Sequence, residues 1–295
     1  MPNAQLIDGK AIAEQIHSET RVRAQALLAR GITPCIIFIR VGDDPASQAY
    51  VRMKGKKAAE LGIRSETLVF PSDLPEADLL AKIHELNADA SVHGILVQAP
   101  LPSQISETVV FSTVSPQKDV DGFNPVNVGL LLLGAENGFR SCTPAGVHEL
   151  LIRSNIPTAG AEVVILGRGN IVGKPLTAIL LQKAKHANAT VTLLHSRSKN
   201  IAEHCRRADI IVAAMGQAHF VKADMVKPGA VVIDVGVNRM DDPTDKRGYK
   251  LVGDVDFEAL LPIAGHITPN PGGVGPMTIA MLLSNTVLAA EKLSA

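Results

Sequence analysis

Tyr50 and Lys54 are the residues of this chain whose types and spacing most directly suggest chemistry. They stand four positions apart in the stretch YVRMKGKK, so on a helix both side chains share one face. A phenol beside an ammonium group can exchange protons with a bound substrate. The neighbouring Lys56 and Lys57 add like charge, which would lower the pKa of Lys54 if a cleft also removed it from water. A lysine cluster on a helix is by itself typical of a solvated surface, so this interpretation needs support from elsewhere in the chain.

Two further polar elements follow in the first half of the chain. The apolar run GILVQAPLP predicts a buried strand that delivers Gln98 at its carboxyl end, where open α/β sheets bind ligands. The next loop, KDVDGF, places Asp119 and Asp121 two residues apart. Paired carboxylates can bind a metal ion, but no His or further acid stands at ligand spacing, so a metal site is disfavoured. A single carboxylate that accepts from an aminopyrimidine edge fits this loop better.

A glycine loop in the second half has the context of a nucleotide site. Gly167, Gly169 and Gly173 stand in VVILGRGNIVGKP, after a buried strand and before a helix, where backbone amides and the helix dipole can receive a phosphate. The spacing is one residue longer than the dinucleotide fingerprint, so a glycine turn that binds nothing is the alternative. A P-loop is disfavoured because Pro175 replaces the Ser or Thr that would hold magnesium.

The residues after the next strand indicate which dinucleotide such a site would take. An NAD-specific site offers an acid to the ribose hydroxyls at this point, whereas this chain has Ser196 and Arg197. A hydroxyl and a guanidinium, together with Arg168 of the glycine loop, suit the extra phosphate of NADP. A solvated basic loop is the alternative interpretation.

The elements that must position these residues alternate between helix and strand. Strands of this kind, separated by helices, imply crossover connections and mainly parallel sheets, hence an α/β fold with a doubly wound second half. A Pro/Gly-rich passage from Pro100 to Pro125 is predicted to form loops. The last apolar helix has no strand after it, so we expect it to pack back on the first domain. The predicted helices cover 8–30, 46–61, 74–87, 145–154, a stretch ending at 186 and the residues after 273, and the predicted strands cover 35–41, 67–70, 92–98, 163–166, 191–194, 210–214 and 231–235.

Composition excludes several classes of protein. The 295 residues contain 29 Lys plus Arg and 29 Asp plus Glu, so no net charge favours binding to nucleic acid or to an anionic membrane. Aromatic residues make up only 3% of the chain, which argues against a stacking platform for single-stranded nucleic acid. The three cysteines, Cys35, Cys142 and Cys205, lie far apart and indicate a reducing compartment. With no signal peptide visible, the sequence predicts a cytoplasmic protein.

Eight motifs stand in a distinctive order along the chain: YVRMK, GILVQAPLP, KDVDGFNP, CTPAG, GRGNIVGKP, DVGVNR, GDVDF and ITPNPGGVGPMT. In this order they resemble the bifunctional methylenetetrahydrofolate dehydrogenase/cyclohydrolase (FolD) family, over essentially the whole chain. The resemblance implies an α/β folate domain with a parallel sheet at 1–142 plus 272–295 and a Rossmann-type NADP-binding domain at 143–271. It also implies a homodimer.

The resemblance assigns roles to individual residues. Lys54 would be the acid/base residue, Tyr50 would stack along the folate, and Gln98 would hold Lys54 and polarise the reacting centre. Asp121 would anchor the pterin amino group. Further folate contacts are implied for Pro100, Gly273 and Pro276, and NADP contacts for Gly167, Arg168, Gly169, Ile171, Val172, Ser196, Arg197 and Val237.

The chain departs from the family pattern at three positions that spare Lys54 and Gln98. Gly169 replaces the usual Ser of the glycine loop, Ala99 replaces a bulkier apolar residue, and Asn270 replaces Val. The implied function is NADP-dependent oxidation of 5,10-methylenetetrahydrofolate to 5,10-methenyltetrahydrofolate, followed by hydrolysis to 10-formyltetrahydrofolate. An NADP dehydrogenase for another small substrate, and a folate- or dinucleotide-binding module without turnover, are the alternatives.

Overall fold

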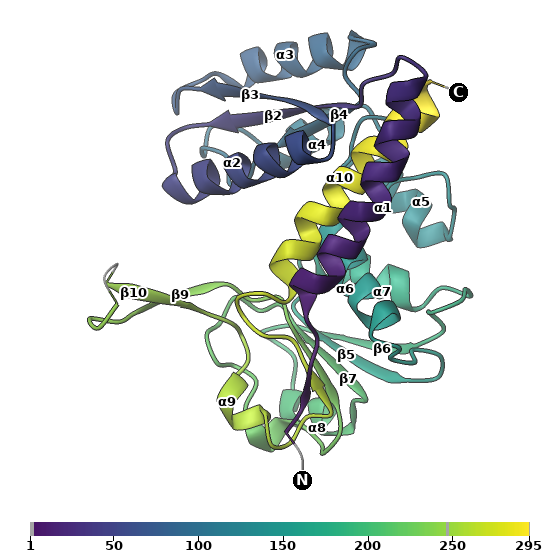
Figure 1. Ribbon diagram of the computed structural model, residues 1–295. Helices are drawn as coiled ribbons and strands as arrows, with labels where there is room; N and C mark the ends of the chain where they lie inside the picture. Colours follow the sequence, from purple (N-terminus) through teal and green to yellow (C-terminus); the bar gives the residue numbers. More distant parts are fainter. Residues whose placement is uncertain (1–2, 246–247, 295) are drawn as a thin grey trace. The chain divides into compact units, whose positions relative to one another are not determined.

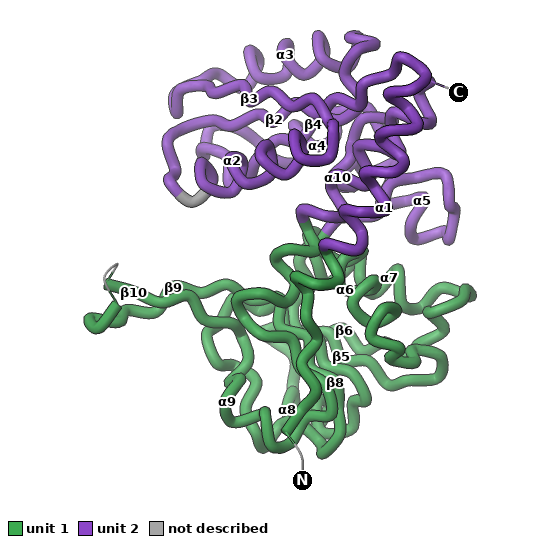
Figure 2. The backbone as a smooth tube through the Cα atoms, in the orientation of Figure 1, with its two compact units in different colours: residues 1–13, 143–278 green, residues 14–142, 279–295 purple. Residues whose placement is uncertain are grey.

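The computed structural model describes residues 3–245 and 248–294 and divides the chain into two compact units (Figures 1 and 2). Unit 1 contains residues 1–13 and 143–278, and unit 2 contains residues 14–142 and 279–295. All three division points fall inside helices, namely α1 (Gly9–Ala29), α6 (Cys142–Arg153), whose first residue alone belongs to unit 2, and α10 (Val274–Leu293). Each unit is therefore built from two separate stretches of sequence. The predicted two-domain α/β fold is confirmed.

Unit 2 is built on a three-stranded parallel sheet in the order β3-β2-β4. Every residue of β2 is buried, as expected for a central parallel strand covered on both faces. β3 begins three residues before the predicted strand, because its first half is a polar, partly exposed edge without an apolar pattern. The elements of this sheet and its flanking helices are β2 (Cys35–Val41), α2 (Pro45–Glu60), β3 (Arg64–Phe70), α3 (Glu76–Ala88) and β4 (Gly94–Val97).

Alternating residues of β2 face two different hydrophobic layers. Ile37 and Ile39 pack in a cluster with Leu79 and Ile83 of α3. Ile36 and Phe38 face the opposite cluster, which contains Val51 and Ala58 of α2, Ala24 and Leu27 of α1, and Leu282, Leu283 and Val287 of α10. Figure 1 shows α1 and α10 side by side, and an ion pair of 2.7 Å joins Arg23 to Glu291. The prediction that the last helix packs on the first domain is confirmed.

The passage after β4 contains two helices that the sequence did not predict, α4 (Glu107–Thr113) and α5 (Pro125–Leu133). In α5 the proline stands in the first turn, where its missing N–H costs no helical hydrogen bond. Asn124 caps this helix by accepting a hydrogen bond from the Val126 N–H at 2.8 Å. Pro125, which the sequence predicts to lie in a loop, is therefore the first residue of a helix.

Unit 1 contains a six-stranded parallel sheet in the order β1-β11-β8-β7-β5-β6. Because β6 lies on one side of β5 and β7 on the other, the direction of the crossovers changes between β5 and β7, which makes this the switch point of a doubly wound sheet. Four of these strands were predicted, whereas β1 and β11 have two residues each and are too short to carry a pattern. The strands are β1 (Gln5–Leu6), β5 (Glu162–Leu166), β6 (Thr190–Leu194), β7 (Ile210–Ala213), β8 (Val231–Asp234) and β11 (His266–Ile267).

The remaining elements of unit 1 connect these strands. The helix α7 ends at Leu180 rather than at the predicted His186, because the residues from Lys183 to His186 are exposed and contain no large apolar side chain to bury. A hairpin of β9 (Asn238–Asp241) and β10 (Tyr249–Val252) is a feature the sequence did not predict. The connecting helices are α6 (Cys142–Arg153), α7 (Gly173–Leu180), α8 (Ile201–Arg207), a 3-10 turn (Ala223–Met225) and α9 (Phe257–Leu260).

By length and composition α10 also meets the criteria for a membrane-spanning helix. More than half of its most apolar window, 56%, is buried inside the protein. Its contacts with α1 and β2 are those of a core helix in a globular unit.

Candidate active site

Tyr50, Lys54 and Gln98 lie together in unit 2. The ammonium group of Lys54 donates a hydrogen bond of 3.0 Å to Oε1 of Gln98 and lies 4.4 Å from the centre of the Tyr50 ring. The Gln98 amide donates its own N–H to the Ala99 carbonyl at 2.7 Å, so its oxygen is left to face the lysine. The structure thus joins α2 and the carboxyl end of β4 through the side chains that the sequence singled out.

The start of α2 is fixed by a local capping interaction. The Asp44 carboxylate accepts a hydrogen bond of 2.7 Å from the Ser47 N–H, and Pro45 occupies the first helical position. Both features favour a helix that begins at this residue. From this start, one turn separates Tyr50 from Lys54, which places both on the same helical face.

Lys54 is an ammonium group held away from water. Only 3% of the residue is exposed, and burial lowers its pKa, with Asp121 and Cys142 acting in the opposite direction. The predicted lowering of the Lys54 pKa by the charge of Lys57 is not found. The Lys57 ammonium forms ion pairs with Glu14 at 3.0 Å and with Glu60 at 2.9 Å, which stabilise its charge within unit 2.

The two acids of the KDVDGF loop have different environments. Asp119 is buried, and its carboxylate shapes the loop by accepting hydrogen bonds of 2.8 to 3.1 Å. The donors are the backbone N–H groups of Gly122, Phe123 and Asn124 and the side-chain amide of Asn127. Asp119 is therefore the structural acid of the pair, a distinction that the sequence did not reveal.

Asp121 interacts electrostatically with the Lys54 ammonium. Burial raises the pKa of its carboxyl, and the Lys54 ammonium and the Cys142 thiol lower it. The same thiol donates to the Val120 carbonyl at 3.2 Å, and burial and the Asp121 carboxylate raise the pKa of Cys142 well above its usual range. Cys142 is thus a neutral thiol that packs against the acid, a role that sequence reasoning missed although the residue opens the CTPAG motif.

The glycine loop of unit 1 needs two of its three glycines for backbone packing. A Cβ on Gly167 would lie 2.1 Å from the Ala214 carbonyl oxygen, and one on Gly173 would lie 1.7 Å from the Gly167 carbonyl oxygen. Nothing lies within 4 Å of the corresponding position on Gly169, which is exposed. The Gly167 and Gly173 positions therefore form a close-packed cradle, whereas Gly169 leaves space for a side chain.

The other predicted cofactor residues occupy loops at one edge of the sheet. Arg168 follows β5, Ser196 and Arg197 follow β6, and Val237 follows β8, and all four are exposed. The strands are parallel, so these loops extend from the same, carboxyl edge. The turn after β6 is held by a hydrogen bond from the Arg197 N–H to the His195 ring at 3.1 Å, and no carboxylate stands at its tip. Ile171 and Val172 lie in the glycine loop just before α7.

The PNPGG segment of unit 1 and the residues just after it contain Gly273 and Pro276, which are predicted to contact the folate, and Asn270. A Cβ on Gly273 would lie 2.7 Å from the Pro269 carbonyl oxygen, and Pro276 stands in the first turn of α10. Asn270, which departs from the family pattern, donates a hydrogen bond of 2.5 Å to the Gly236 carbonyl. The folate contacts of Gly273 and Pro276 stay predictions, while Asn270 has a structural partner.

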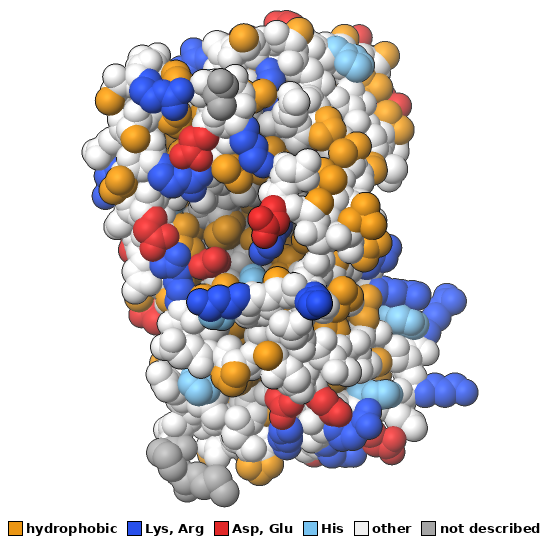
Figure 3. Space-filling model, turned by 90° about the vertical axis from the view of Figure 1, so that its right-hand side faces the viewer, with side chains coloured by type: hydrophobic (Ala, Val, Ile, Leu, Met, Phe, Trp, Pro, Cys, Tyr) orange, Lys and Arg blue, Asp and Glu red, His pale blue; other side chains and the backbone are white. Residues whose placement is uncertain are grey.

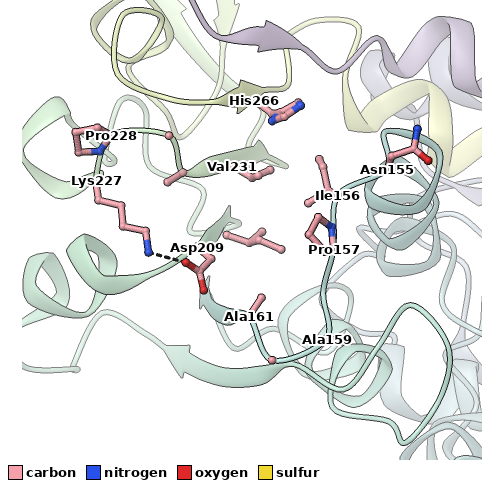
Figure 4. Close-up of a pocket in the computed structure, with 14 residues that line it drawn as sticks. Asn155, Ile156, Pro157, Ala159, Ala161, Asp209, Lys227, Pro228, Val231 and His266 are labelled. Carbon is pink, nitrogen blue, oxygen red and sulfur yellow. Dashed lines mark hydrogen bonds and ion pairs between the residues drawn. The ribbon is translucent and has the colours of Figure 1, made fainter. Parts of the chain in front are cut away.

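A pocket of about 510 Å³ lies at the opposite edge of the unit 1 sheet (Figure 4). Residues at or just before the starts of β5, β7, β8 and β11 line it, among them Ala161, Ile210, Val231 and His266. At its rim Lys227 pairs with Asp209 at 2.6 Å. None of the predicted site residues lines this pocket, and ligands of doubly wound sheets bind at the carboxyl edge.

In the part of the chain that the structure describes, neither a metal centre nor a surface of one charge marks a second site. Within residues 3–245 and 248–294, no group of three or more His, Cys, Asp and Glu side chains is placed to hold a metal ion. On the face shown in Figure 3, acidic and basic side chains lie interspersed.

Comparison with protein families matches both halves of the chain. Residues 7–121 match the model described as the tetrahydrofolate dehydrogenase/cyclohydrolase catalytic domain, and residues 141–294 match the corresponding NAD(P)-binding domain. Two relatives named bifunctional protein FolD cover nearly all of the chain. The protein from Chlorobium chlorochromatii is 51% identical over 98% of this chain and 99% of its own length. The protein from Salinibacter ruber is 54% identical over 98% and 96%.

Solved structures agree with these matches. FolD from Campylobacter jejuni, described as a methylenetetrahydrofolate dehydrogenase/cyclohydrolase, has a TM-score of 0.93 and 46% identity over 98% of this chain and 99% of its own. FolD from Trypanosoma brucei, solved with NADP cofactor and an inhibitor, has a TM-score of 0.93 and 40% identity over 99% of both chains.

Proposed function

The chain belongs to the tetrahydrofolate dehydrogenase/cyclohydrolase family, and we propose that Lys54, Gln98 and Asp121 perform its folate chemistry. It is a bifunctional enzyme that oxidises 5,10-methylenetetrahydrofolate with NADP and hydrolyses the methenyl product to 10-formyltetrahydrofolate. The observation that carries the residue assignment is the hydrogen bond between buried Lys54 and Gln98, beside the Asp121 carboxylate.

Lys54 is the proposed base and acid of the hydration step. Burial lowers the pKa of its ammonium, so a larger fraction is neutral amine at the working pH. A neutral amine takes a proton from the water that attacks the methenyl carbon. The ammonium formed returns that proton to the ring nitrogen as the carbon–nitrogen bond opens, while the hydroxyl of the hydrated intermediate loses its own proton to solvent and becomes the formyl carbonyl. The hydrogen bond to Gln98 keeps Nζ at the carboxyl end of β4 during both transfers.

Asp121, Tyr50 and Pro100 are the further residues of unit 2 that we assign to the folate. The Asp121 carboxylate accepts from the two adjacent donors of the aminopyrimidine edge, a geometry that suits a carboxylate. The ring of Tyr50 stacks along the folate. Pro100, two residues after Gln98, contributes an apolar contact at the same edge of the sheet.

The carboxyl edge of unit 1 fits a dinucleotide phosphate. The close-packed positions Gly167 and Gly173 allow backbone N–H groups to approach a phosphate. We assign the extra phosphate of NADP to Arg168, Ser196 and Arg197, while further cofactor contacts come from Gly169, Ile171, Val172 and Val237. When bound, NADP supplies the hydride acceptor, and the task of these residues is to bind and orient it.

The assembly and location of the enzyme are also proposals. We infer a homodimer in the cytoplasm, supplying one-carbon units for purine, methionine and histidine biosynthesis. The separated cysteines and zero net charge of the sequence are consistent with this location. Light scattering of the purified protein tests the dimer, with a monomer at all concentrations as the contrary result.

A two-part absorbance assay tests the function. With methylenetetrahydrofolate and NADP, we expect NADPH to form, and with methenyltetrahydrofolate alone, we expect the methenyl absorbance to decay faster than without enzyme. NADP turnover with an unrelated small substrate only would favour another dehydrogenase. Binding without either reaction would identify a binding module.

A further inference from the structure

One buried carboxylate in unit 1 collects four hydrogen bonds from two loops. Asp254 has no exposed surface. It accepts from the backbone N–H groups of Met215 at 2.5 Å, Gly216 at 2.9 Å and Gln217 at 2.9 Å. It also accepts from the side-chain amide of Asn238 at 2.9 Å. The first three donors belong to the loop after β7, and the fourth lies at the start of β9, just past the loop after β8.

Both loops extend from the carboxyl edge of the sheet, next to the switch point. A Cβ on Gly167 would lie only 2.1 Å from the carbonyl oxygen of Ala214. The loop after β7 therefore packs directly on the glycine loop. Asn238 is the neighbour of Val237, whose side chain is 67% exposed. Asp254 therefore holds the loop after β7, which lies beside the switch point. It also holds Asn238, the neighbour of the exposed Val237.

A second carboxylate holds Asp254 itself. Asp234, at the end of β8, accepts from the N–H groups of Asp254 at 2.9 Å and Val255 at 3.2 Å, and from that of Gly236 at 3.0 Å. The packing leaves no space, because a Cβ on Gly236 would lie 2.1 Å from Asp254 and one on Gly253 would lie 1.6 Å from Asp234. The position of the Asp254 carboxylate is thus set by the sheet and by neighbouring backbone.

We propose that Asp254 is a positioning residue for NADP, which acts by fixing the loops after β7 and β8 against the glycine loop. This inference rests on the proposed placement of NADP at the carboxyl edge. A carboxylate suits the task because it offers several acceptor sites to converging N–H groups. An amide at the same place offers only one oxygen, so it holds fewer of the donors.

The test compares Asp254→Asn and Asp254→Ala with Asp209→Ala in the full-length enzyme. Asp209 is a matched control, since its carboxylate also accepts a backbone N–H, from Glu162 at 2.8 Å, and pairs with Lys227, but at the opposite edge of the sheet. We expect NADP binding, measured by calorimetry, to weaken about tenfold in Asp254→Asn and further in Asp254→Ala, with little change in Asp209→Ala. The KM for NADP should rise more than kcat falls.

Hydrogen exchange of the amides at 215–217 gives a second readout that does not depend on turnover. We expect faster exchange there in Asp254→Asn, with wild-type rates in the loop bearing Arg197. Wild-type NADP affinity in an Asp254→Asn variant with faster exchange would overturn the proposal. Equal NADP loss in Asp254→Asn and Asp209→Ala at equal thermal stability would also overturn it, since the effect would then be general to the unit.

The proposed placement of NADP is tested separately with Arg168→Ala combined with Arg197→Ala. Unchanged NADP binding in that double variant would refute the placement itself. Loss of NADP binding there, together with unchanged binding in Asp254→Asn, would refute only the positioning role.

Discussion

Lys54 combines a cation with a site that excludes water. Burial lowers its pKa, whereas its partner, Gln98 Oε1 at 3.0 Å, is a neutral acceptor that does not restore the charge as a carboxylate would. Asp121 opposes the shift through space. The balance leaves a lysine able to act as a base, which is the property that the hydration step requires.

Lys54→Met should abolish hydrolysis of methenyltetrahydrofolate, because methionine preserves the length of the side chain but cannot accept a proton. Hydride transfer depends on positioning and should fall less. The decay of methenyl absorbance and the formation of NADPH measure the two activities separately. Wild-type hydrolysis in the folded variant would refute the role of Lys54.

Asp121→Ala should weaken folate binding and leave NADP binding nearly unchanged. The substitution leaves donors of the pterin unpaired, at a cost of roughly 1–3 kcal/mol for each unsatisfied group. Calorimetric titrations with a folate analogue and with NADP measure the two affinities. Asp119→Ala is expected to unfold the loop instead, since that carboxylate holds three backbone amides. Unchanged folate affinity in Asp121→Ala would show that the pterin lies elsewhere.

Asp234 should make the stability of the protein depend on pH. Burial raises its pKa to about 6, above the ordinary value of about 3.9 that applies in the unfolded chain. Between these values the folded protein holds a proton that the unfolded chain releases, so the free energy of unfolding should fall as pH rises from about 4 to about 6. In Asp234→Asn this slope should be smaller, and the remainder comes from other carboxyls whose pKa burial raises, such as those of Asp119 and Asp121. Urea denaturation across this pH range measures it, and an identical slope in both proteins would contradict the assignment.

At the level of elements, the residues that we assign to cofactor binding lie in loops at the ends of parallel strands, whereas the residues that stabilise the fold lie in the strands. β5 and β6 are held by their apolar residues, while Arg168, Ser196 and Arg197 are exposed just beyond them. Such residues can change the choice of cofactor without a large effect on the core.

Arg168→Ala combined with Arg197→Ala should raise the KM for NADP and leave the use of NAD little changed, because both guanidinium groups are assigned to the phosphate that NAD lacks. Initial rates with each dinucleotide provide the measurement. Gly169→Ser is a useful companion, since the space around Gly169 admits a hydroxyl that should strengthen phosphate binding. An equal loss for NADP and NAD would mean that the arginines contact a part common to both.

Elements with a strong local pattern could be predicted from the sequence, and those defined by their surroundings could not. The strand at Cys35–Val41 has the observed limits because it is an unbroken apolar run. β1 and β11 exist only through pairing with β8 and with each other, and no two-residue segment carries such information. The Tyr50 and Lys54 spacing follows from helical geometry, whereas the contact with Gln98 depends on packing between elements.

The roles of the carboxylates also could not be predicted from the sequence. Asp119 and Asp121 look alike in the sequence, yet one binds backbone amides and the other interacts electrostatically with Lys54. Asp254 belongs to a motif that supported only the family resemblance, and its four donors come from residues 16 to 39 positions away. Roles of this kind depend on which donors converge on an oxygen, which only the folded backbone determines.

For the whole molecule, the chain divides into two units, each with its own hydrophobic core, and most of the residues that we assign to the two ligands fall in different units. The residues assigned to NADP belong to unit 1, and Tyr50, Lys54, Gln98 and Asp121 belong to unit 2. Binding stabilises a folded state by an amount that grows with the logarithm of the ligand concentration over its Kd, about 2.7 kcal/mol when the ligand is at a hundred times its Kd. Each ligand should therefore protect mainly the unit that carries its contacts.

Hydrogen exchange with saturating NADP or with a folate analogue tests this division in the intact enzyme. NADP should slow exchange in the glycine loop, because its amides lie beside the proposed phosphate. It should also slow exchange at 215–217, because the loop after β7 packs on the glycine loop. The folate analogue should slow exchange at 119–124 and along α2, because Asp121 and Lys54 become fixed by the ligand. Arg168→Ala combined with Arg197→Ala should weaken only the NADP response at matched concentration. Protection of 119–124 by NADP alone, equal to that by the folate analogue, would contradict the assignment of the two ligands to different units.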